Sequence, residues 1–162
     1  MRGVSMRIIV MSDSHGRTNS IRNVLSMHPE ARACIFLGDG ERDFDSASAE
    51  FDGIDFYAVA GNCDLAGQNP PSLLIELGGK RIFASHGHNQ YVKYGIERLV
   101  TAATACGADI ALFGHTHQSM TQYIDGLYLM NPGSVGGVHV SKKTYGLIDI
   151  ERGGVLMNIG EI

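Results

Sequence analysis

Seven side chains that can bind a metal ion occur in this chain, each in a short glycine-containing loop that follows an apolar run. The set comprises two aspartates, one asparagine and four histidines: Asp13, His15, Asp39, Asn62, His86, His115 and His117. Carboxylate, amide and imidazole groups that converge from several loops are typical of hydrolytic centres with two metal ions. The sequence therefore predicts a binuclear metal site.

Each of these loops follows a segment that is typical of a β-strand covered on both faces. The five predicted strands cover residues 8–11, 34–37, 56–60, 82–84 and 110–113. In α/β proteins, binding sites lie at the carboxyl ends of the strands. We therefore expect the five loops to face one cleft.

The ligand types leave the identity of the metal open. Oxygen and imidazole ligands without thiolates suit Mn²⁺, Fe²⁺, Ni²⁺ or Zn²⁺, and manganese is our first choice. Asp13 and Asp39 are the anionic members of the set, so two divalent ions would leave a net positive charge. Such a centre attracts a phosphate ester and stabilises its transition state, with a hydroxide between the two metal ions as the nucleophile.

A structural role is the alternative for each of these residues taken singly. A lone histidine after a strand is more often a hydrogen-bonded core residue than a metal ligand. Asn62 could be a turn residue before Cys63. Coincidence is nevertheless a poor explanation for seven such residues in five loops, so the metal site is the favoured interpretation.

Helical and hairpin patterns complete the predicted architecture. Apolar residues recur at helical spacing over residues 18–27 and 94–106, and 44–51 is a weaker helical candidate. Three strand pairs with tight turns predict hairpins: 73–77 with 81–85, 120–124 with 127–130, and 145–151 with 155–159 around Gly153-Gly154. We expect one α/β domain over residues 1–162, with a flexible start at 1–5 and helices outside a mixed sheet or two packed sheets.

Composition restricts the class of protein further. The chain has 162 residues, of which 44% are hydrophobic and 19% charged, as in globular domains with a substantial core. Its net charge of −4 disfavours stable binding of nucleic acid. We find no apolar run of membrane-spanning length and no signal-peptide pattern. Three cysteines without a Cys-x-x-Cys pair then predict a cytoplasmic protein with reduced thiols.

The loop motifs, read in order, resemble the signature of the calcineurin-like metallophosphoesterases, and in particular their small stand-alone phosphodiesterase branch. The motifs are Asp13-Ser14-His15, Gly38-Asp39, Gly61-Asn62, His86-Gly87, Gly114-His115-Thr116-His117 and Asn131-Pro132-Gly133-Ser134. The resemblance covers residues 6 to about 134. It implies a four-layer α/β/β/α sandwich with two mixed sheets and hydrolysis of a small-molecule phosphodiester.

The resemblance also implies a role for each ligand. One metal ion would be held by Asp13, His15, Asp39 and His117. The second ion would share Asp39 and would also be held by Asn62, His86 and His115. Asn62 would in addition contact the substrate phosphate.

The chain departs from many relatives at Cys63, where they carry a general-acid histidine in the sequence Gly-Asn-His-Glu. A thiol is a poorer proton donor at neutral pH than an imidazolium, which favours diesters or activated esters as substrates. His88, two residues after His86, could supply the proton, and a solvent-facing loop histidine is the equal alternative. We expect Cys63 to be a packed small residue rather than a metal ligand or a redox-sensitive group.

Two arginines near the ligand loops could bind an anion. Arg17 stands at a predicted helix start, where its guanidinium could face the substrate, although solvated surface is the equal alternative. Arg42 follows Asp39 closely, but its acidic neighbours Glu41 and Asp43 suggest a local ion pair instead. Arg17 is therefore the predicted substrate-binding arginine.

Other classes of function remain open at this point. The superfamily that the motifs resemble also contains a retromer coat subunit, which makes a non-catalytic interaction scaffold the main alternative. The seven ligands argue against it, because a protein selected only for binding partners has no physical need for them. A nuclease is disfavoured by the acidic balance. A homodimer is also expected, because small α/β proteins with short strands often associate.

Overall fold

Two five-stranded sheets form the centre of the computed structural model, which describes residues 5–152 and 154–162. The first sheet has the order β10-β9-β1-β2-β3, with β1 Met6–Met11, β2 Ala33–Phe36, β3 Asp55–Ala58, β9 Thr144–Glu151 and β10 Gly154–Glu161. The second has the order β4-β5-β6-β8-β7, with β4 Ser72–Leu77, β5 Lys80–Ser85, β6 Ile110–Leu112, β7 Met120–Ile124 and β8 Leu127–Asn131.

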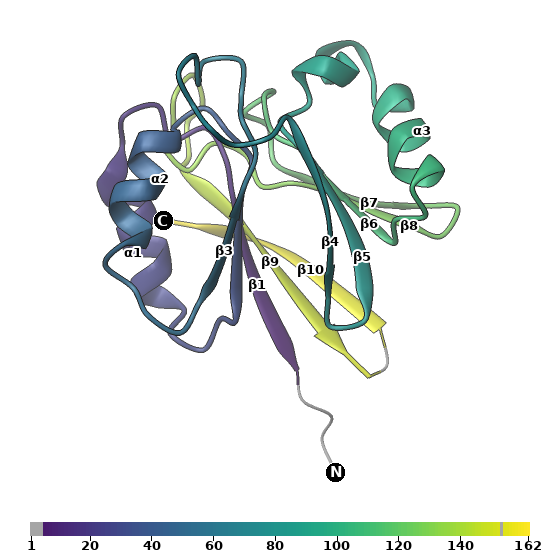
Figure 1. The fold of residues 1–162 in the computed structure, drawn as a ribbon, viewed down its shortest axis with the longest axis horizontal. Helices are drawn as coiled ribbons and strands as arrows, with labels where there is room; N and C mark the ends of the chain where they lie inside the picture. The colour runs from purple at the N-terminus through teal and green to yellow at the C-terminus, as the bar shows by residue number, and fades with distance from the viewer. Residues whose placement is uncertain (1–4, 153) are drawn as a thin grey trace.

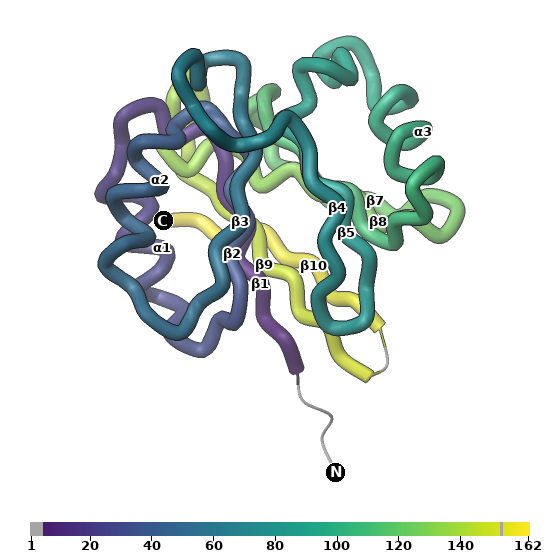
Figure 2. Tube along the Cα trace, in the orientation of Figure 1, coloured from purple at the N-terminus to yellow at the C-terminus, as the bar shows by residue number. Residues whose placement is uncertain are grey.

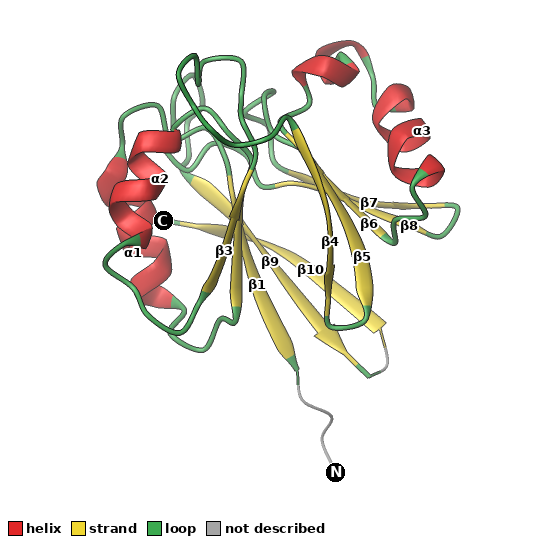
Figure 3. Cartoon of the chain, in the orientation of Figure 1, coloured by secondary structure: helices red, strands yellow, loops and turns green. Residues whose placement is uncertain are grey.

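Helices cover the outer faces of both sheets (Figures 1 and 3). α1 (Thr18–Met27) and α2 (Glu41–Ser48) lie on the first sheet, and α3 (Glu97–Ala105) lies on the second. Two 3₁₀ turns, η1 (His88–Gln90) and η2 (Val92–Tyr94), precede α3. The result is a four-layer α/β/β/α sandwich, which confirms the predicted fold class.

Alternation along β1 explains the layering. Ile8 and Val10 point between the two sheets and pack in one core with Ile82 and Leu112 of the second sheet. Ile9 and its alternate neighbours point the other way, into a second core under α1 and α2. Because successive side chains of a strand face opposite sides, a strand buried on both sides must be apolar throughout, as this one is.

Both sheets are mixed, and their parallel strands bring the loops together. β1, β2 and β3 are parallel to one another, as are β5, β6 and β8, whereas β9, β10, β4 and β7 pair antiparallel with their neighbours. Figure 2 shows that the loops after β1, β2, β3, β5 and β6 gather at one end of the molecule, opposite the start of β1. The predicted cleft lies at this end.

Most predicted elements are confirmed, and two helices start elsewhere. α1 matches its predicted range, but α2 spans 41–48 instead of 44–51, and α3 begins at 97 instead of 94. Gly95 has φ +142°, which an α-helix cannot contain, so the chain forms η2 first. The earlier start of α2 depends on a cap that comes from a distant loop, described below.

The predicted hairpins form at all three places, with strand ends shifted by one or two residues. Part of the predicted flexible start, residues 1–4, lies outside the described residues, as does Gly153 of the last predicted turn. None of the described helices has the length and apolar character required to span a membrane.

Candidate metal centre

Hydrogen bonds tie the ligand loops to one another beyond the strand ends. The amide of Asp13 donates to the carbonyl of Gly38 (2.9 Å), and the amide of His15 donates to the carbonyl of Asp39 (3.1 Å). In the second sheet, the amide of Gly114 donates to the carbonyl of His86 (2.9 Å). These bonds continue the pairing of parallel strands into the loops, so each loop carries its side chain to the same edge.

The first group of ligand atoms consists of Asp13, His15 and His117, whose donor atoms all lie within 4.8 Å of one another. Asp13 Oδ1 lies 3.2 Å from His117 Nε2 and 3.5 Å from His15 Nε2. The two imidazole Nε2 atoms are 3.3 Å apart. One carboxylate and two imidazoles thus converge on a point that suits a cation.

The second group consists of Asp39, His86 and His115, again within 4.8 Å. His86 Nε2 lies 3.3 Å from Asp39 Oδ2 and 3.2 Å from His115 Nδ1. Asp39 Oδ2 also lies 3.7 Å from His15 Nε2 of the first group. Asp39 therefore stands between the two groups, at the place where a bridging carboxylate is expected.

Backbone strain is concentrated at these residues. Eight residues other than glycine have positive φ in the described part of the chain, and five of them are predicted ligands: Asp13, His15, Asp39, His115 and His117. The left-handed conformation is costly for residues with a Cβ atom and persists where the surrounding structure enforces it, most often at functional sites. The conformation points to a site that is built at the expense of local stability.

The tautomers of two histidines are fixed by backbone carbonyls. Nδ1 of His86 donates to the carbonyl of Leu37 (2.6 Å), and Nδ1 of His117 donates to the carbonyl of Val138 (2.7 Å). A carbonyl can only accept, so each ring carries its proton on Nδ1 and keeps the lone pair of Nε2 for a ligand. Both Nε2 atoms face the aspartates.

Electrostatics in the two groups favour ionised aspartates. Burial opposes ionisation of Asp13, but the nearby imidazoles of His117 and His15 hold the pKa of its carboxyl well below the ordinary value. Burial alone would lower the pKa of His86, yet Asp39 and Asp13 together raise that pKa. The pKa of His115 is lowered to about 4, chiefly by burial. Negative charge thus accumulates where the imidazoles converge.

The fit of this arrangement to metal ions can be tested on Asp13. Its Oδ1 atom is buried and accepts no hydrogen bond from any residue within 5–152 or 154–162. An unsatisfied buried carboxylate oxygen is unfavourable unless a cation binds it. Together with the unprotonated Nε2 atoms, this orphaned oxygen fits a divalent ion, and the donor set suits the borderline metals expected from the sequence.

The end of β8 and the residues that follow it support the ligand loops. Asn131 Nδ2 donates to the carbonyl of Gly114 (3.1 Å) and to Oγ1 of Thr116 (2.9 Å). The Ser134 hydroxyl donates to the carbonyl of Asp13 (2.7 Å). The Asn-Pro-Gly-Ser motif therefore supports the loops of both histidine and aspartate ligands.

Asn62 and His88 lie beside the two groups of ligand atoms. Asn62 is exposed, and the side-chain hydrogen bond seen for it goes to Cys63 Sγ (3.6 Å). The His88 ring centroid lies 5.4 Å from that of His86, and burial lowers the pKa of His88. His88 is thus close enough to interact with a ligand, but the lowered pKa weakens it as a proton donor at neutral pH.

Cys63 does not pack as a small core residue, contrary to expectation. Its side chain is exposed, and Sγ lies within 4.8 Å of donor atoms of both His15 and Asp39. Burial and the charge of Asp39 raise the pKa of the thiol. Cys63 therefore faces the site as a thiol.

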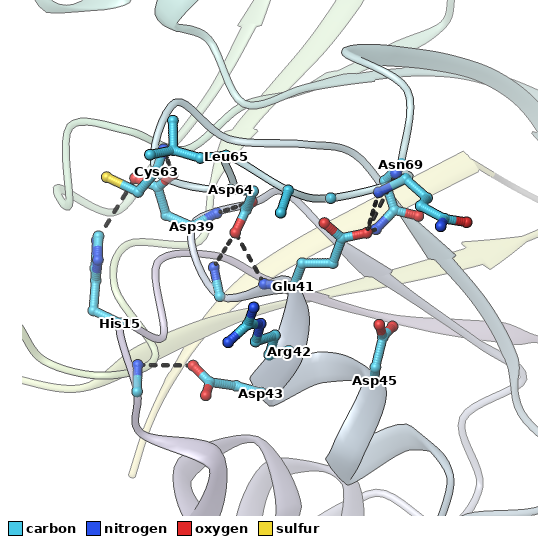
Figure 4. A pocket seen from close by; sticks show the side chains of 15 residues that line it. His15, Asp39, Glu41, Arg42, Asp43, Asp45, Cys63, Asp64, Leu65 and Asn69 are labelled. Carbon is cyan, nitrogen blue, oxygen red and sulfur yellow. Dashed lines mark hydrogen bonds and ion pairs between the residues drawn. The ribbon is translucent and has the colours of Figure 1, made fainter.

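A cavity of about 730 Å³ opens beside the site (Figure 4). His15, Asp39 and Cys63 line it together with the first turns of α2 and the loop 63–69. Arg42 lines this cavity, whereas Arg17 does not and is exposed at the start of α1. The structure thus places Arg42, which the sequence interpretation set aside, next to the candidate site.

The expected ion pair of Arg42 with its neighbours does not form. Glu41 accepts hydrogen bonds from the amides of Gln68 and Asn69, and Asp43 accepts from Ser14 and from other groups of the first ligand loop. Arg42 forms no ion pair with the residues that the structure describes. No periodicity or motif signalled the partners of Glu41 and Asp43, because they come from other loops.

Comparison with known proteins gives the family. Residues 6–153 match the calcineurin-like phosphoesterase superfamily domain. The chain belongs to this superfamily. The family that the loop motifs resemble is therefore confirmed.

Relatives of this metallophosphoesterase-family chain are of similar length. The probable metallophosphoesterase YsnB of Bacillus subtilis is 30% identical over 149 residues, which cover 91% of this chain and 86% of the relative. The phosphodiesterase MJ0936 of Methanocaldococcus jannaschii is 26% identical over 163 residues, with 91% and 95% covered. The structure of vacuolar protein sorting 29 from Cryptosporidium parvum has a TM-score of 0.79 at 16% identity and covers 98% of both chains, which shows a shared fold.

Proposed function

We propose that this protein is a metal-dependent phosphodiesterase that hydrolyses a small-molecule phosphodiester. The observation that carries the proposal is the pair of ligand groups, Asp13 with His15 and His117, and Asp39 with His86 and His115. The two groups meet at Asp39, beside a cavity of about 730 Å³. The name of the relative MJ0936 as a phosphodiesterase supports the reaction type.

Two divalent ions, with manganese as our first choice and nickel, zinc or iron as alternatives, would supply the Lewis acidity that activates water and neutralises phosphoryl oxygens. The residues of the chain would hold the ions and contact the substrate. Asp39 would contact both ions, and its position is fixed by the hydrogen bond that Cys63 donates from its amide to Oδ1 (2.8 Å). Asn62, next to this contact and exposed, would complete the second group and contact the phosphate.

A poor leaving group needs a proton donor when the P–O bond breaks, whereas an activated leaving group does not. Cys63 has a raised pKa and His88 a lowered one, so neither is a strong acid catalyst at neutral pH. We therefore expect faster turnover of diesters and activated esters than of unactivated esters. His88→Ala tests the proposed role of His88: loss of activity on an unactivated diester alone supports proton donation, and full activity on it contradicts that role.

The proposal also includes the expectations from sequence on substrate class, location, oligomeric state and domain number. A small-molecule diester suits the acidic chain better than a nucleic acid. A cytoplasmic location, a homodimer and a single domain over the whole chain stay predictions. Size-exclusion chromatography with light scattering measures the oligomeric state directly.

Hydrolysis assays with matched variants test the proposed function. Protein stripped of metal would be reconstituted with Mn²⁺, Ni²⁺, Zn²⁺ or Mg²⁺ and assayed on bis(4-nitrophenyl) phosphate and 4-nitrophenyl phosphate. We expect metal-dependent turnover with preference for the diester, abolished in Asp39→Asn. Asp45→Asn is the control, because Asp45 is an exposed carboxylate that lines the same cavity.

The interaction scaffold is the competing function. The shared fold with a vacuolar protein sorting 29 keeps it in consideration. Binding of two metal ions without turnover of any ester would favour the scaffold, and the same protein would then be used to search for partners.

A further inference from the structure

The Asp64 carboxylate collects four backbone amides from two ligand loops. Its Oδ2 atom accepts from the amides of Asp39 (2.8 Å) and Gly61 (2.8 Å). Its Oδ1 atom accepts from the amides of Gly40 (3.0 Å) and Glu41 (3.1 Å). Figure 4 shows Asp64 between the loop of Asp39 and the start of α2, with its bonds to the amides of Asp39 and Glu41 among the dashed lines.

These bonds begin where the sheet ends. β2 and β3 are parallel neighbours whose register runs to Phe36 and Ala58, and the amide of Val59 makes the last ladder bond to Phe36 (3.0 Å). Beyond it the two loops remain packed against each other at Gly38 and Gly61. Oδ2 of Asp64 adds a further link between them, because the amides of Asp39 and Gly61 share that single atom.

Asp64 also supplies the missing cap of α2. Gly40 stands at the N-cap position and has no side chain to accept a hydrogen bond. The first amides of a helix lack intrahelical partners, and a negative charge near them is favourable. The carboxylate of Asp64 satisfies those amides from a loop more than twenty residues away, which fixes where α2 begins.

The acceptor capacity of Asp64 is used up by these contacts. A carboxylate offers about four lone-pair positions, and four amides occupy them. Although Asp64 lines the cavity, it is therefore available neither as a metal ligand nor as a proton acceptor from substrate. Its effect on the site must pass through the backbone that it holds.

We propose that Asp64 is a positioning residue that sets the spacing between Asp39 and the Gly61-Asn62 turn, and thereby the second metal position; this rests on the metal site of the proposed function. Asp39 has φ +61°, a conformation that needs external support. The amide bond to Asp64 holds that backbone, and the amide of Cys63 holds the Asp39 carboxylate. Without Asp64, Asp39 and Asn62 would no longer approach one ion together.

Asp64→Asn tests the proposal, because an amide group keeps the size of the side chain but loses one acceptor atom and turns two donors toward backbone amides. Mn²⁺ titration by calorimetry should show weaker binding at one of the two sites, by about tenfold to a hundredfold. Electron paramagnetic resonance should show loss of the spin-coupled Mn²⁺ pair. A purely structural role would lower the melting temperature and leave both metal signatures unchanged in the folded fraction.

Glu41→Gln is the matched control. Glu41 is the first residue of α2, whose amides Asp64 holds, but its own carboxylate accepts from Gln68 and Asn69, a segment without a predicted ligand. We expect it to bind Mn²⁺ as the unmodified protein does. Equal metal binding by Asp64→Asn and Glu41→Gln would overturn the proposal.

A second measurement does not depend on whether Asp64→Asn folds. In the unmodified protein, stripped of metal, hydrogen exchange should be slow at the amides of Asp39, Gly40, Glu41 and Gly61, because Asp64 accepts from them. Fast exchange at these amides would also overturn the proposal. Failure of the proposed function gives a different result, namely two bound metal ions without ester hydrolysis. In that case the effect of Asp64→Asn on metal binding still decides the positioning role.

Discussion

His86 donates a hydrogen bond from Nδ1 to the backbone carbonyl of Leu37 at 2.6 Å. This bond connects the end of β5 in the second sheet to the end of β2 in the first. It therefore fixes the imidazole across the interface between the sheets and turns its Nε2 atom toward Asp39. The second ligand group thus depends on how the two sheets pack.

His86→Ala should remove a predicted ligand and the bond to Leu37 together. We expect at least about tenfold weaker binding of one metal ion, together with a loss of stability because the ring is fully buried. Calorimetric titration with Mn²⁺ measures the affinity. His28→Ala is the control: His28 bonds to Tyr145 away from the predicted ligands, so it should lower stability without changing the affinity.

Arg42→Ala should raise KM for a phosphodiester by about tenfold, because a charge-assisted hydrogen bond to the substrate would be lost. Arg17→Ala should leave KM unchanged, because Arg17 does not line the cavity. Steady-state kinetics of both variants on bis(4-nitrophenyl) phosphate compare the two. A larger effect at Arg17 would restore the interpretation drawn from sequence alone.

Arg7→Met should destabilise the protein by about 1 kcal/mol at neutral pH. Arg7 forms ion pairs with Asp149 and Glu30, both at 2.8 Å. The pKa of Glu30 is lowered by its own backbone amide and by Arg7. A lowered folded-state pKa contributes stability above the ordinary value of 4.5 and loses it as the pH falls.

The difference in stability between Arg7→Met and the unmodified protein should therefore shrink as the pH falls from 7 through 4.5. Denaturant unfolding at several pH values measures it. A difference that stays constant down to pH 3 would show that packing of the arginine stem, rather than its charge, stabilises the fold.

Phe44→Ala should cost about 3 kcal/mol of stability. The Phe44 ring is buried and stacks on Phe36 with centroids 4.8 Å apart, and it meets Phe56 edge-on at 5.7 Å. Phe51→Ala is the comparison, because Phe51 packs against the same hydrophobic core but is only partly buried. Chemical denaturation should rank Phe44 well above Phe51, and the reverse order would contradict the packing of α2.

Local pattern was sufficient for much of the fold. The helix over residues 18–27 and the hairpins followed from spacing and turn residues that act within a few positions. The start of α2 did not, because Gly40 cannot cap the helix and the cap comes from Asp64. A contact between segments so far apart leaves no local signal.

The sequence by itself determined the types of the candidate metal ligands, their places after strands and the family motifs. Tertiary structure brings their donor atoms within reach of one another, Asp13 with His15 and His117, and Asp39 with His86 and His115. It also decided that Arg42 rather than Arg17 lines the cavity. The physical reason is that strand ends are set by local pattern, whereas distances between side chains of different loops depend on strand order and on the packing of the two sheets.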